Sequence, residues 1–224
     1  MPKSIVFVAR YNEDISWVES LDQDVVVYNK GDDFPYDFPC NQTENIGRES
    51  ETFVRGIIEY YDMLKEYEYV CFLQGNPFEH CKDVIEWLED YPENYLPLCD
   101  TTTKHHLDFI SFIGKYPLIT VGKIFNLSTS FRLDDKSEYD CMDEINNAIS
   151  LCAFLDIPLT ETYDVLWANG AQYSVNTKFI LNKSLDWWCM FIDLIHYSWA
   201  TGDTKLGYTI EQIWPMIWNY SDGV

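Results

Sequence analysis

Short apolar runs alternate with amphipathic segments along the first ninety residues. Three runs, Ser4–Ala9, Val25–Tyr28 and Tyr69–Leu73, are rich in β-branched or aromatic residues and are followed by turn-forming residues. That pattern is typical of buried strands. Residues 47–64 and 81–89 carry apolar side chains at helical spacing. With a short helix expected after the first strand, the pattern predicts the order strand, helix, strand, helix, strand, helix.

This alternation predicts an α/β fold with a mainly parallel, Rossmann-like sheet flanked by helices. In such sheets, ligands bind beyond the carboxyl ends of the strands. Those ends carry clusters of polar residues here, at positions 10–14, 29–33 and 74–80. We therefore expect these three clusters to meet at one edge of the sheet.

The second half of the chain has a less regular pattern. We expect a helix from Asp140 to Leu155, strands at 165–167 and 171–175, and helices at 184–197 and 209–218. His105 and His106 are expected in a loop, although they could also ligate a metal. No internal repeat or low-complexity linker interrupts the chain, so we predict a single domain over residues 1–224, with halves at 1–100 and 101–224.

The amino-acid composition indicates a hydrophobic core and a strongly negative net charge. The 224 residues are 47% hydrophobic and 17% aromatic, which excludes a disordered chain and a coiled coil. The formal net charge of −22 would repel duplex nucleic acid and anionic membranes. No apolar run approaches the ~20 residues of a membrane span, and seven irregularly spaced cysteines predict free thiols. We expect a cytoplasmic protein.

The start of the long predicted helix suits a phosphate group. Asn45, Gly47 and Arg48 stand there; the glycine allows a ligand to approach the backbone, and the planar guanidinium matches phosphate oxygens. A helix N-terminus also favours anions. The alternative is an ordinary helix start at which Arg48 pairs with Glu49 or Glu51.

Four segments then stand in a characteristic order. A strand runs into residues 10–13, a second strand ends in the polar turn 29–33, Asn-x-Gly begins a helix at 45–47, and an apolar strand runs into 74–76. This order resembles the nucleotide-sugar-binding half of GT-A glycosyltransferases, of the inverting, family-two-like type. The resemblance implies that the donor is bound by Arg10, Asn12, Glu13, Asn45, Gly47, Arg48, Gln74 and Asn76.

Longer strings resemble a narrower group. They are VARYNEDISWV, YNKG, NIGRESETF, FLQGNPFEH, WANGAQYSVNTKFI and IEQIWP, starting at Val8, Tyr28, Asn45, Phe72, Trp167 and Ile210. They are similar to a glycosyltransferase-like family of fungal, bacterial and viral proteins for which no substrate is named. For a viral chain, the implied location is the host cytoplasm.

One departure from the GT-A pattern bears on metal binding. The family's Asp-x-Asp holds Mn²⁺ or Mg²⁺ against the donor diphosphate, but this chain has the neutral Gln74 and Asn76 at those positions. Glu79 and His80 could hold the metal instead, although a histidine directly before a helix also fits a structural role.

The missing carboxylates also allow two explanations without such a metal site. The reaction can be independent of metal, with Arg10, Lys30 or Arg48 supplying positive charge. Otherwise catalysis is lost, and the protein is a non-catalytic sugar-nucleotide- or glycan-binding protein.

The second half is expected to bind the acceptor, a glycan or another hydroxyl compound. The turn of Gly170 and Gln172 resembles an acceptor-side segment, although Gln172 also fits a solvated strand. An inverting transfer needs a carboxylate that takes the acceptor proton. Glu211 and Asp186 are the catalytic candidates, with Asp164 as a further one. Glu211 alternatively complements a helix dipole. The resemblance therefore implies transfer of a sugar from a nucleotide-sugar donor.

Overall fold

The computed structural model describes most of the first half and the C-terminal helices. The described residues are 2–100, 102–108, 151–152, 154–157, 162–168, 170–202 and 206–219. For residues 102–108, 162–168, 212 and 219 only the backbone is described.

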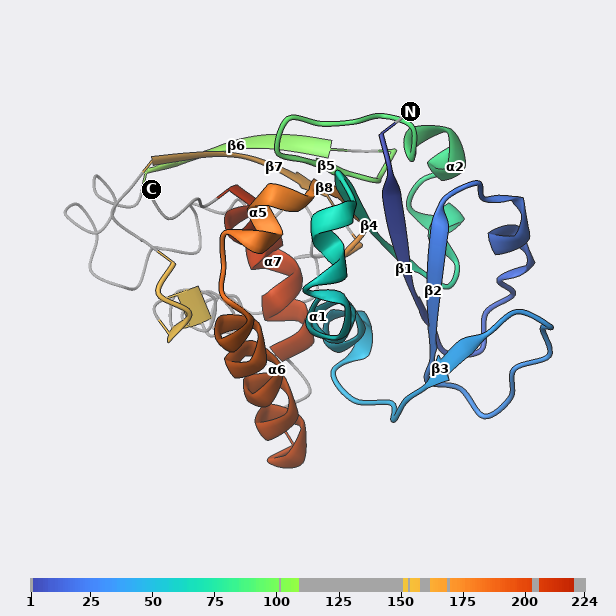
Figure 1. The fold of residues 1–224 in the computed structure, drawn as a ribbon. Coiled ribbons are helices and arrows are strands. Elements are labelled where there is room, and N and C mark those ends of the chain that lie inside the picture. Colours follow the sequence, from blue (N-terminus) through green and yellow to red (C-terminus); the bar gives the residue numbers. More distant parts are fainter. Residues whose placement is uncertain are drawn as a thin grey trace, which may run out of the picture.

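A six-stranded sheet forms the centre of the protein (Figure 1). Its strands are β1 (Ser4–Arg10), β2 (Asp24–Asn29), β3 (Cys40–Gln42), β4 (Tyr69–Gln74), β5 (Tyr95–Pro97) and β8 (Tyr173–Asn176). In the order β3-β2-β1-β4-β8-β5, the first four strands are parallel, and β8 runs antiparallel to both of its neighbours. The predicted mixed α/β fold with a mostly parallel sheet is therefore confirmed.

Helices cover both faces of this sheet (Figure 1). Within the described residues, the α-helices are α1 (Arg48–Tyr60), α2 (Val84–Trp87), α5 (Thr177–Leu181), α6 (Leu185–Ala200) and α7 (Leu206–Asn219). The same residues include the short 3-10 helices η1 (Ser16–Ser20), η2 (Met63–Glu66) and η3 (Pro77–Glu79). α1, α6 and α7 pack on one face, and η1 and α2 pack on the other.

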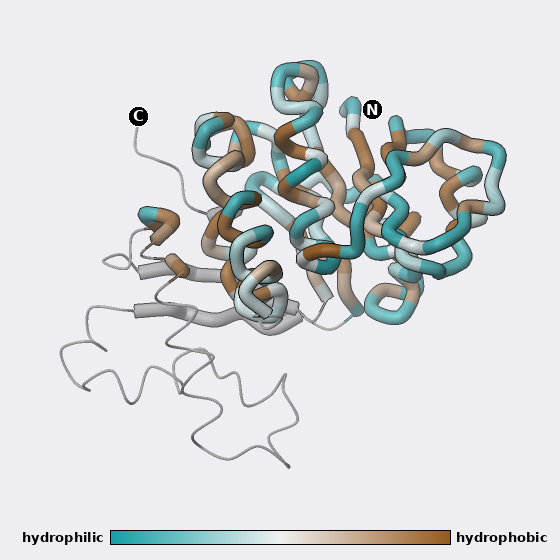
Figure 2. Tube along the Cα trace, turned by 90° about the horizontal axis from the view of Figure 1, so that it is seen from below, coloured by the Kyte–Doolittle hydropathy of each residue, from teal (hydrophilic) through white to brown (hydrophobic). Residues whose placement is uncertain are grey.

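Alternation along the strands creates two apolar layers. Phe7 and Phe72 point into the layer under α1, α6 and α7, whereas Val6 and Val8 point into the layer under η1 and α2. In Figure 2, the outer turns are largely hydrophilic, and hydrophobic positions recur along the strands and helices. The sheet is thus buried on both faces, as expected for parallel strands joined by helical crossovers.

Aromatic rings join α7 to the sheet. The ring of Trp218 stacks on Phe72 with centroids 5.4 Å apart and on Trp214 with centroids 4.7 Å apart. All three side chains are fully buried. These contacts hold α7 against β4. They therefore also determine where the side chains in the first turns of α7 lie relative to the edge of the sheet.

Two predictions about local structure are wrong. The helix expected over residues 81–89 is reduced to the four-residue α2; Pro92 follows soon after and disfavours helical backbone at the residue before it. His105 and His106 lie in a strand, β6 (Thr102–Asp108), which pairs with β7 (Thr162–Ala168). The partner strand is more than fifty residues away, so local sequence did not indicate the pairing.

Three further expectations concern the rest of the chain. The helix expected from Asp140 to Leu155 falls largely outside the described residues. Within the described part, six cysteines are free thiols, and no helix there is both long and apolar enough to cross a membrane.

Replacing Phe72 by alanine tests the aromatic core. We expect the free energy of unfolding to fall by about 3–5 kcal/mol, because the ring leaves a cavity among Trp218, Phe7 and Phe53. Urea titration followed by circular dichroism measures this. Tyr197→Ala, at a ring that is 70% exposed, is the control and should change stability by under about 0.5 kcal/mol. An equal effect of both variants would contradict this packing.

Candidate functional site

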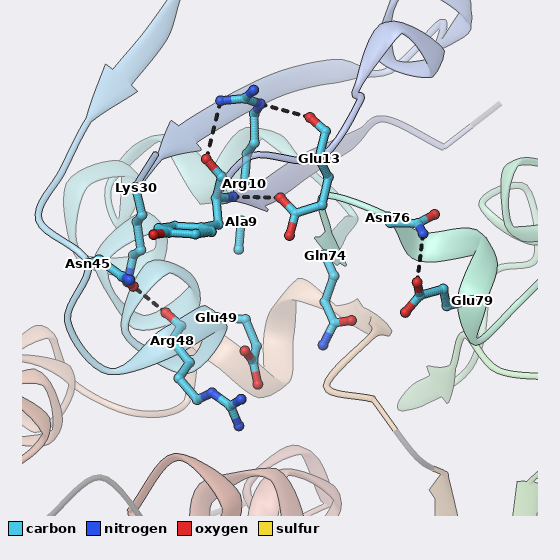
Figure 3. A pocket seen from close by; sticks show the side chains of 11 residues that line it. Ala9, Arg10, Glu13, Lys30, Asn45, Arg48, Glu49, Gln74, Asn76 and Glu79 are labelled. Atoms are coloured by element: carbon cyan, nitrogen blue, oxygen red, sulfur yellow. Dashed lines mark hydrogen bonds between the residues drawn. The ribbon is translucent and has the colours of Figure 1, made fainter. Parts of the chain in front are cut away.

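The carboxyl ends of β1, β2 and β4 lie side by side and form one wall of a hollow. Register pairs Ala9 of β1 with Tyr28 of β2 and with Gln74 of β4, so the residues that follow these strands emerge at one edge. The hollow has a volume of about 400 Å³ (Figure 3). Its lining residues are Ala9, Arg10, Tyr11, Glu13, Lys30, Asn45, Arg48, Glu49, Gln74, Asn76 and Glu79. The expected convergence of the polar clusters is observed.

The hollow concentrates positive charge in a strongly acidic protein. Three of the chain's fifteen lysines and arginines line it, together with three glutamates. The formal charges of the lining therefore cancel, whereas the whole chain carries −22. An anionic ligand is repelled less here than by the average surface of this protein.

Arg10, predicted to bind the donor, turns its guanidinium away from the hollow (Figure 3). It is buried and donates to the Asn29 Oδ1 at 2.6 Å, the Asp33 carbonyl at 2.7 Å and the Glu13 carbonyl at 2.9 Å. These bonds tie the turns after β1 and β2 together. Arg10 therefore shapes the wall of the hollow, and its guanidinium is not directed at a ligand there.

Glu13 and Asn12 lie in the same turn but have different positions. The Glu13 carboxylate accepts from the backbone N–H of Tyr11 at 2.6 Å and of Asn12 at 3.1 Å. It also sits over Gly75, where a Cβ would come within 2.5 Å of Oε2. Asn12 is exposed and its side chain lies against Gly31. Glu13 thus lines the hollow, whereas Asn12 stands beside it.

The chain enters α1 through two left-handed residues. Gly47 has φ 60° and Arg48 has φ 56°. Glycine is required at 47, because a Cβ there would collide with the side chain of Ile195 on α6. The Arg48 guanidinium lies over the ring of Tyr208 at 4.4 Å. Among the described side chains, Arg48 pairs with neither Glu49 nor Glu51, so an ordinary helix start with such a pair is not supported.

The residues after β4 are split between the hollow and its rim. Gln74 points toward Glu49 across the hollow, and Asn76 donates to Glu79 at 3.0 Å (Figure 3). The His80 ring packs against Gly170, where a Cβ would come within 2.7 Å of the ring. Asn76 and Glu79 therefore engage each other, and His80 fills space behind the rim.

The described residues place no third metal-ligating side chain beside Glu79 and His80. Nowhere in the described part of the chain do three His, Cys, Asp or Glu side chains come together as ligands. His80 packs against a glycine, and the Glu79 carboxylate accepts a hydrogen bond from an amide. The use of Mn²⁺ or Mg²⁺ stays a prediction.

Gln172 has a structural position, which neither interpretation of its sequence predicted. It is buried; its Nε2 donates to the Leu98 carbonyl at 3.1 Å and to the Pro77 carbonyl at 3.3 Å, and its Oε1 accepts from the Gln74 N–H at 3.3 Å. The side chain thus joins β8 to the end of β4. It is neither solvated nor placed to contact an acceptor.

Gly170 and Glu211 do not line the hollow, but Glu211 interacts electrostatically with two residues that do, Arg48 and Glu49. The Gly170 N–H donates to the Glu211 Oε1 at 2.8 Å, and Gly170 has φ 82°. Burial, together with the negative charge of Glu49, raises the pKa of Glu211 to about 7. The hydrogen bond from the Gly170 N–H and the positive charge of Arg48 act in the opposite direction and lower it. Because Glu49 and Arg48 both line the hollow, a carboxylate that titrates near neutral pH lies next to it.

The second catalytic candidate is placed elsewhere. Asp186 is exposed in the first turn of α6 and lines a different hollow, with Phe154, Met190 and Tyr197. The structure therefore does not bring Asp186 together with the donor-side residues. Asp164 lies in β7, where only the backbone is described.

Two lining residues, Tyr11 and Glu49, were not named as candidate site residues, although Tyr11 belongs to the polar cluster 10–14 that was expected at this edge. Tyr11, 48% exposed, follows β1 directly, so the rule that ligands bind beyond the carboxyl ends of the strands applies to it. Glu49 was considered only as a partner for Arg48. Its position in the hollow follows from the turn that precedes α1, which local spacing does not indicate.

Comparisons with known proteins identify no relative. No family model, no curated protein and no solved structure matches the chain.

The raised pKa of Glu211 predicts how stability changes with pH. An acid whose pKa rises from 4.5 to about 7 on folding binds its proton more tightly in the folded state, so it destabilises the fold as pH rises through that window. We expect the stability of the wild type relative to Glu211→Gln to fall between pH 4.5 and pH 8, by up to about 3 kcal/mol.

Urea titrations of both proteins at several pH values measure this difference. The glutamine side chain can still accept a hydrogen bond from the Gly170 N–H, so the comparison isolates the effect of the carboxylate charge. Glu79→Gln makes the same chemical change at an exposed carboxylate and controls for the loss of one charge. A difference between wild type and Glu211→Gln that does not change with pH would contradict the prediction.

Proposed function

We propose that this protein is a GT-A-like glycosyltransferase that moves a sugar from a nucleotide-sugar donor to a hydroxyl acceptor. The observation that carries the proposal is the shared hollow at the carboxyl ends of β1, β2 and β4, which the resemblance to glycosyltransferases had implied from sequence-distant residues. Its volume of about 400 Å³ lies in the range of small-molecule sites.

The donor phosphates are assigned to the start of α1. Among the cations that line the hollow, Arg48 is the one whose guanidinium donates no hydrogen bond to a described residue. It can therefore donate to phosphate oxygens. Asn45 and Gln74 add neutral polar groups on either side. The exposed ring of Tyr11 offers a flat surface for a base or a sugar.

Glu211 is assigned the role of general base. A carboxylate with a pKa of about 7 is ionised in a large fraction of molecules at neutral pH and is basic enough to accept a hydroxyl proton. The hydrogen bond from Gly170 fixes its orientation. The acceptor would approach from the side of Gly170 and α7, with the donor sugar between it and Arg48.

A non-catalytic sugar-nucleotide-binding protein is the second candidate. It is favoured by Gln74 and Asn76, which replace the two carboxylates of the family pattern, and by the hydrogen bond between Asn76 and Glu79. This function would use the same hollow without a reaction at Glu211.

Calorimetry with UDP, GDP and their sugars, with and without Mn²⁺, tests binding. We expect saturable binding of at least one donor, and the comparison with Mn²⁺ decides whether a metal takes part. Wild-type protein that binds no member of a broad panel would contradict the proposal and the binding-only function together.

Arg48→Ala tests the assignment of the phosphates. We expect donor affinity to fall roughly tenfold or more, because a charge-assisted hydrogen bond contributes about 1.5–3 kcal/mol. Lys65→Ala removes an exposed lysine that pairs with nearby Asp62 and is the control, with affinity unchanged. Unchanged affinity in Arg48→Ala would remove Arg48 from the site.

Glu211→Gln separates catalysis from binding. We expect donor hydrolysis or transfer by the wild type to rise with pH around 7, and the variant to lose at least about 100-fold of this rate while it still binds the donor. Product analysis by chromatography measures the rate. Binding without turnover in the wild type would support the non-catalytic function.

A further inference from the structure

Lys30 lines the hollow, but its ammonium group makes its contacts within the protein. Its Nζ donates to the carbonyl of Ile46 at 2.5 Å and to the carbonyl of Arg48 at 2.6 Å, and it lies 2.8 Å from the Glu51 carboxylate. An ammonium group has three N–H donors. Two hydrogen bonds to carbonyls and an ion pair with Glu51 thus commit the ammonium group of Lys30 within the protein in this arrangement.

Glu51 completes a buried pair with Lys30. The side chains of Lys30 and Glu51 are only 4% and 1% exposed. The other carboxylate oxygen of Glu51 accepts from Arg55 on the same helix and lies 3.2 Å from His196 on α6. The pair thus connects the end of β2 with α1 and α6.

Burial acts against both charges, and the pair compensates in part. Burial lowers the pKa of Lys30, although Glu51 opposes this. Burial would raise the pKa of Glu51, but Lys30 and Arg55 outweigh it and hold the pKa below its ordinary value. A buried ion pair of this kind adds little net stability compared with apolar side chains. Its contacts with two specific carbonyls point instead to control of local geometry.

Those two carbonyls flank the strained part of the turn. Gly47 and Arg48, both with left-handed backbone, stand at this point. Arginine rarely adopts this conformation, which persists only where the surroundings impose it. Lys30 holds the carbonyls on both sides of Gly47, and so determines the direction in which Arg48 leaves the backbone.

We propose that Lys30 and Glu51 act as a positioning pair, which holds residues 46–48 in the conformation that presents Arg48 to the phosphates of the donor. The proposal rests on the function proposed above. It assigns to Lys30 a role through Arg48 in place of direct contact with the ligand.

The test combines substitutions in the Lys30–Glu51 pair with a substitution of Arg48, the residue that the pair is proposed to position. Lys30→Met alone would leave a buried carboxylate without its lysine, so the main variant is Lys30→Met with Glu51→Gln. Arg48→Ala is made alone and in that background. Lys183→Met is the matched control, because Lys183 is also buried and its Nζ also donates to a backbone carbonyl, that of Ile217 at 2.9 Å, but it does not line the hollow.

Binding is measured by calorimetry with whichever of UDP and GDP the wild type binds more tightly, at a temperature where circular dichroism shows each variant folded. We expect the double variant and Arg48→Ala each to weaken binding about tenfold, and the triple variant to be no weaker than about twentyfold, because all act through one group. A hundredfold loss in the triple variant, or wild-type affinity in the double variant, would overturn the proposal.

Two further measurements keep the outcome decisive. If the double variant does not fold, Lys30→Arg replaces it; its planar fork cannot reach the same three groups, so about tenfold weaker binding is expected and wild-type affinity overturns the proposal. Amide hydrogen exchange of residues 46–49 without nucleotide should speed up in the double variant or in Lys30→Arg, and not in Lys183→Met. If exchange speeds up in this way but the wild type binds no nucleotide, the control of local geometry stands and the proposed function alone is rejected.

Discussion

The parallel register of β1, β2 and β4 is the constraint on which the rest of the site depends. It brings three turns that are far apart in sequence to one edge of the sheet. The tight approach of these turns is visible at Gly31, where a Cβ would overlap the Tyr11 carbonyl oxygen. A side chain at this position would separate the two strand ends, so the hollow exists only because the backbones can approach this closely.

The cations of this edge have separate tasks. Arg10 and Lys30 are buried, and their donors are directed at carbonyl and amide oxygens of neighbouring turns. The irregular backbone of these turns leaves carbonyl groups that need hydrogen-bond donors. One ammonium or guanidinium group can donate to several such carbonyls, which explains the use of charged side chains at these positions. Arg48, exposed and stacked on Tyr208, is the lining cation whose charge can be given to a ligand. Positive charge near a strand end is therefore a poor guide to ligand contact unless its hydrogen bonds are counted.

How far the sequence predicts the structure depends on the range of the contacts. The long strands and α1 follow from local periodicity, and most lining residues follow from where these strands end. The short β3 and β5 were not predicted, since three residues carry too little pattern. Gln172 and Arg10 were misassigned for a different reason: polar side chains near a site were assumed to face it, but their partners come from other turns. Their roles depend on hydrogen bonds across the fold, which spacing does not encode.

The amides at 74 and 76 make sense in the charge balance of the hollow. The lining already holds Glu13, Glu49 and Glu79, and Glu211 adds a further negative charge when it ionises. With aspartate at both amide positions, the lining alone would hold five carboxylates against three cations, two of which are committed to the backbone. An anionic diphosphate would then be strongly repelled unless a divalent cation intervened. Neutral Gln74 and Asn76 keep the lining at three carboxylates and three cations, so that an anion near Arg48 meets no excess of negative charge in the lining. The neutral side chains at 74 and 76 and the carboxylates around the hollow are thus two parts of one electrostatic arrangement.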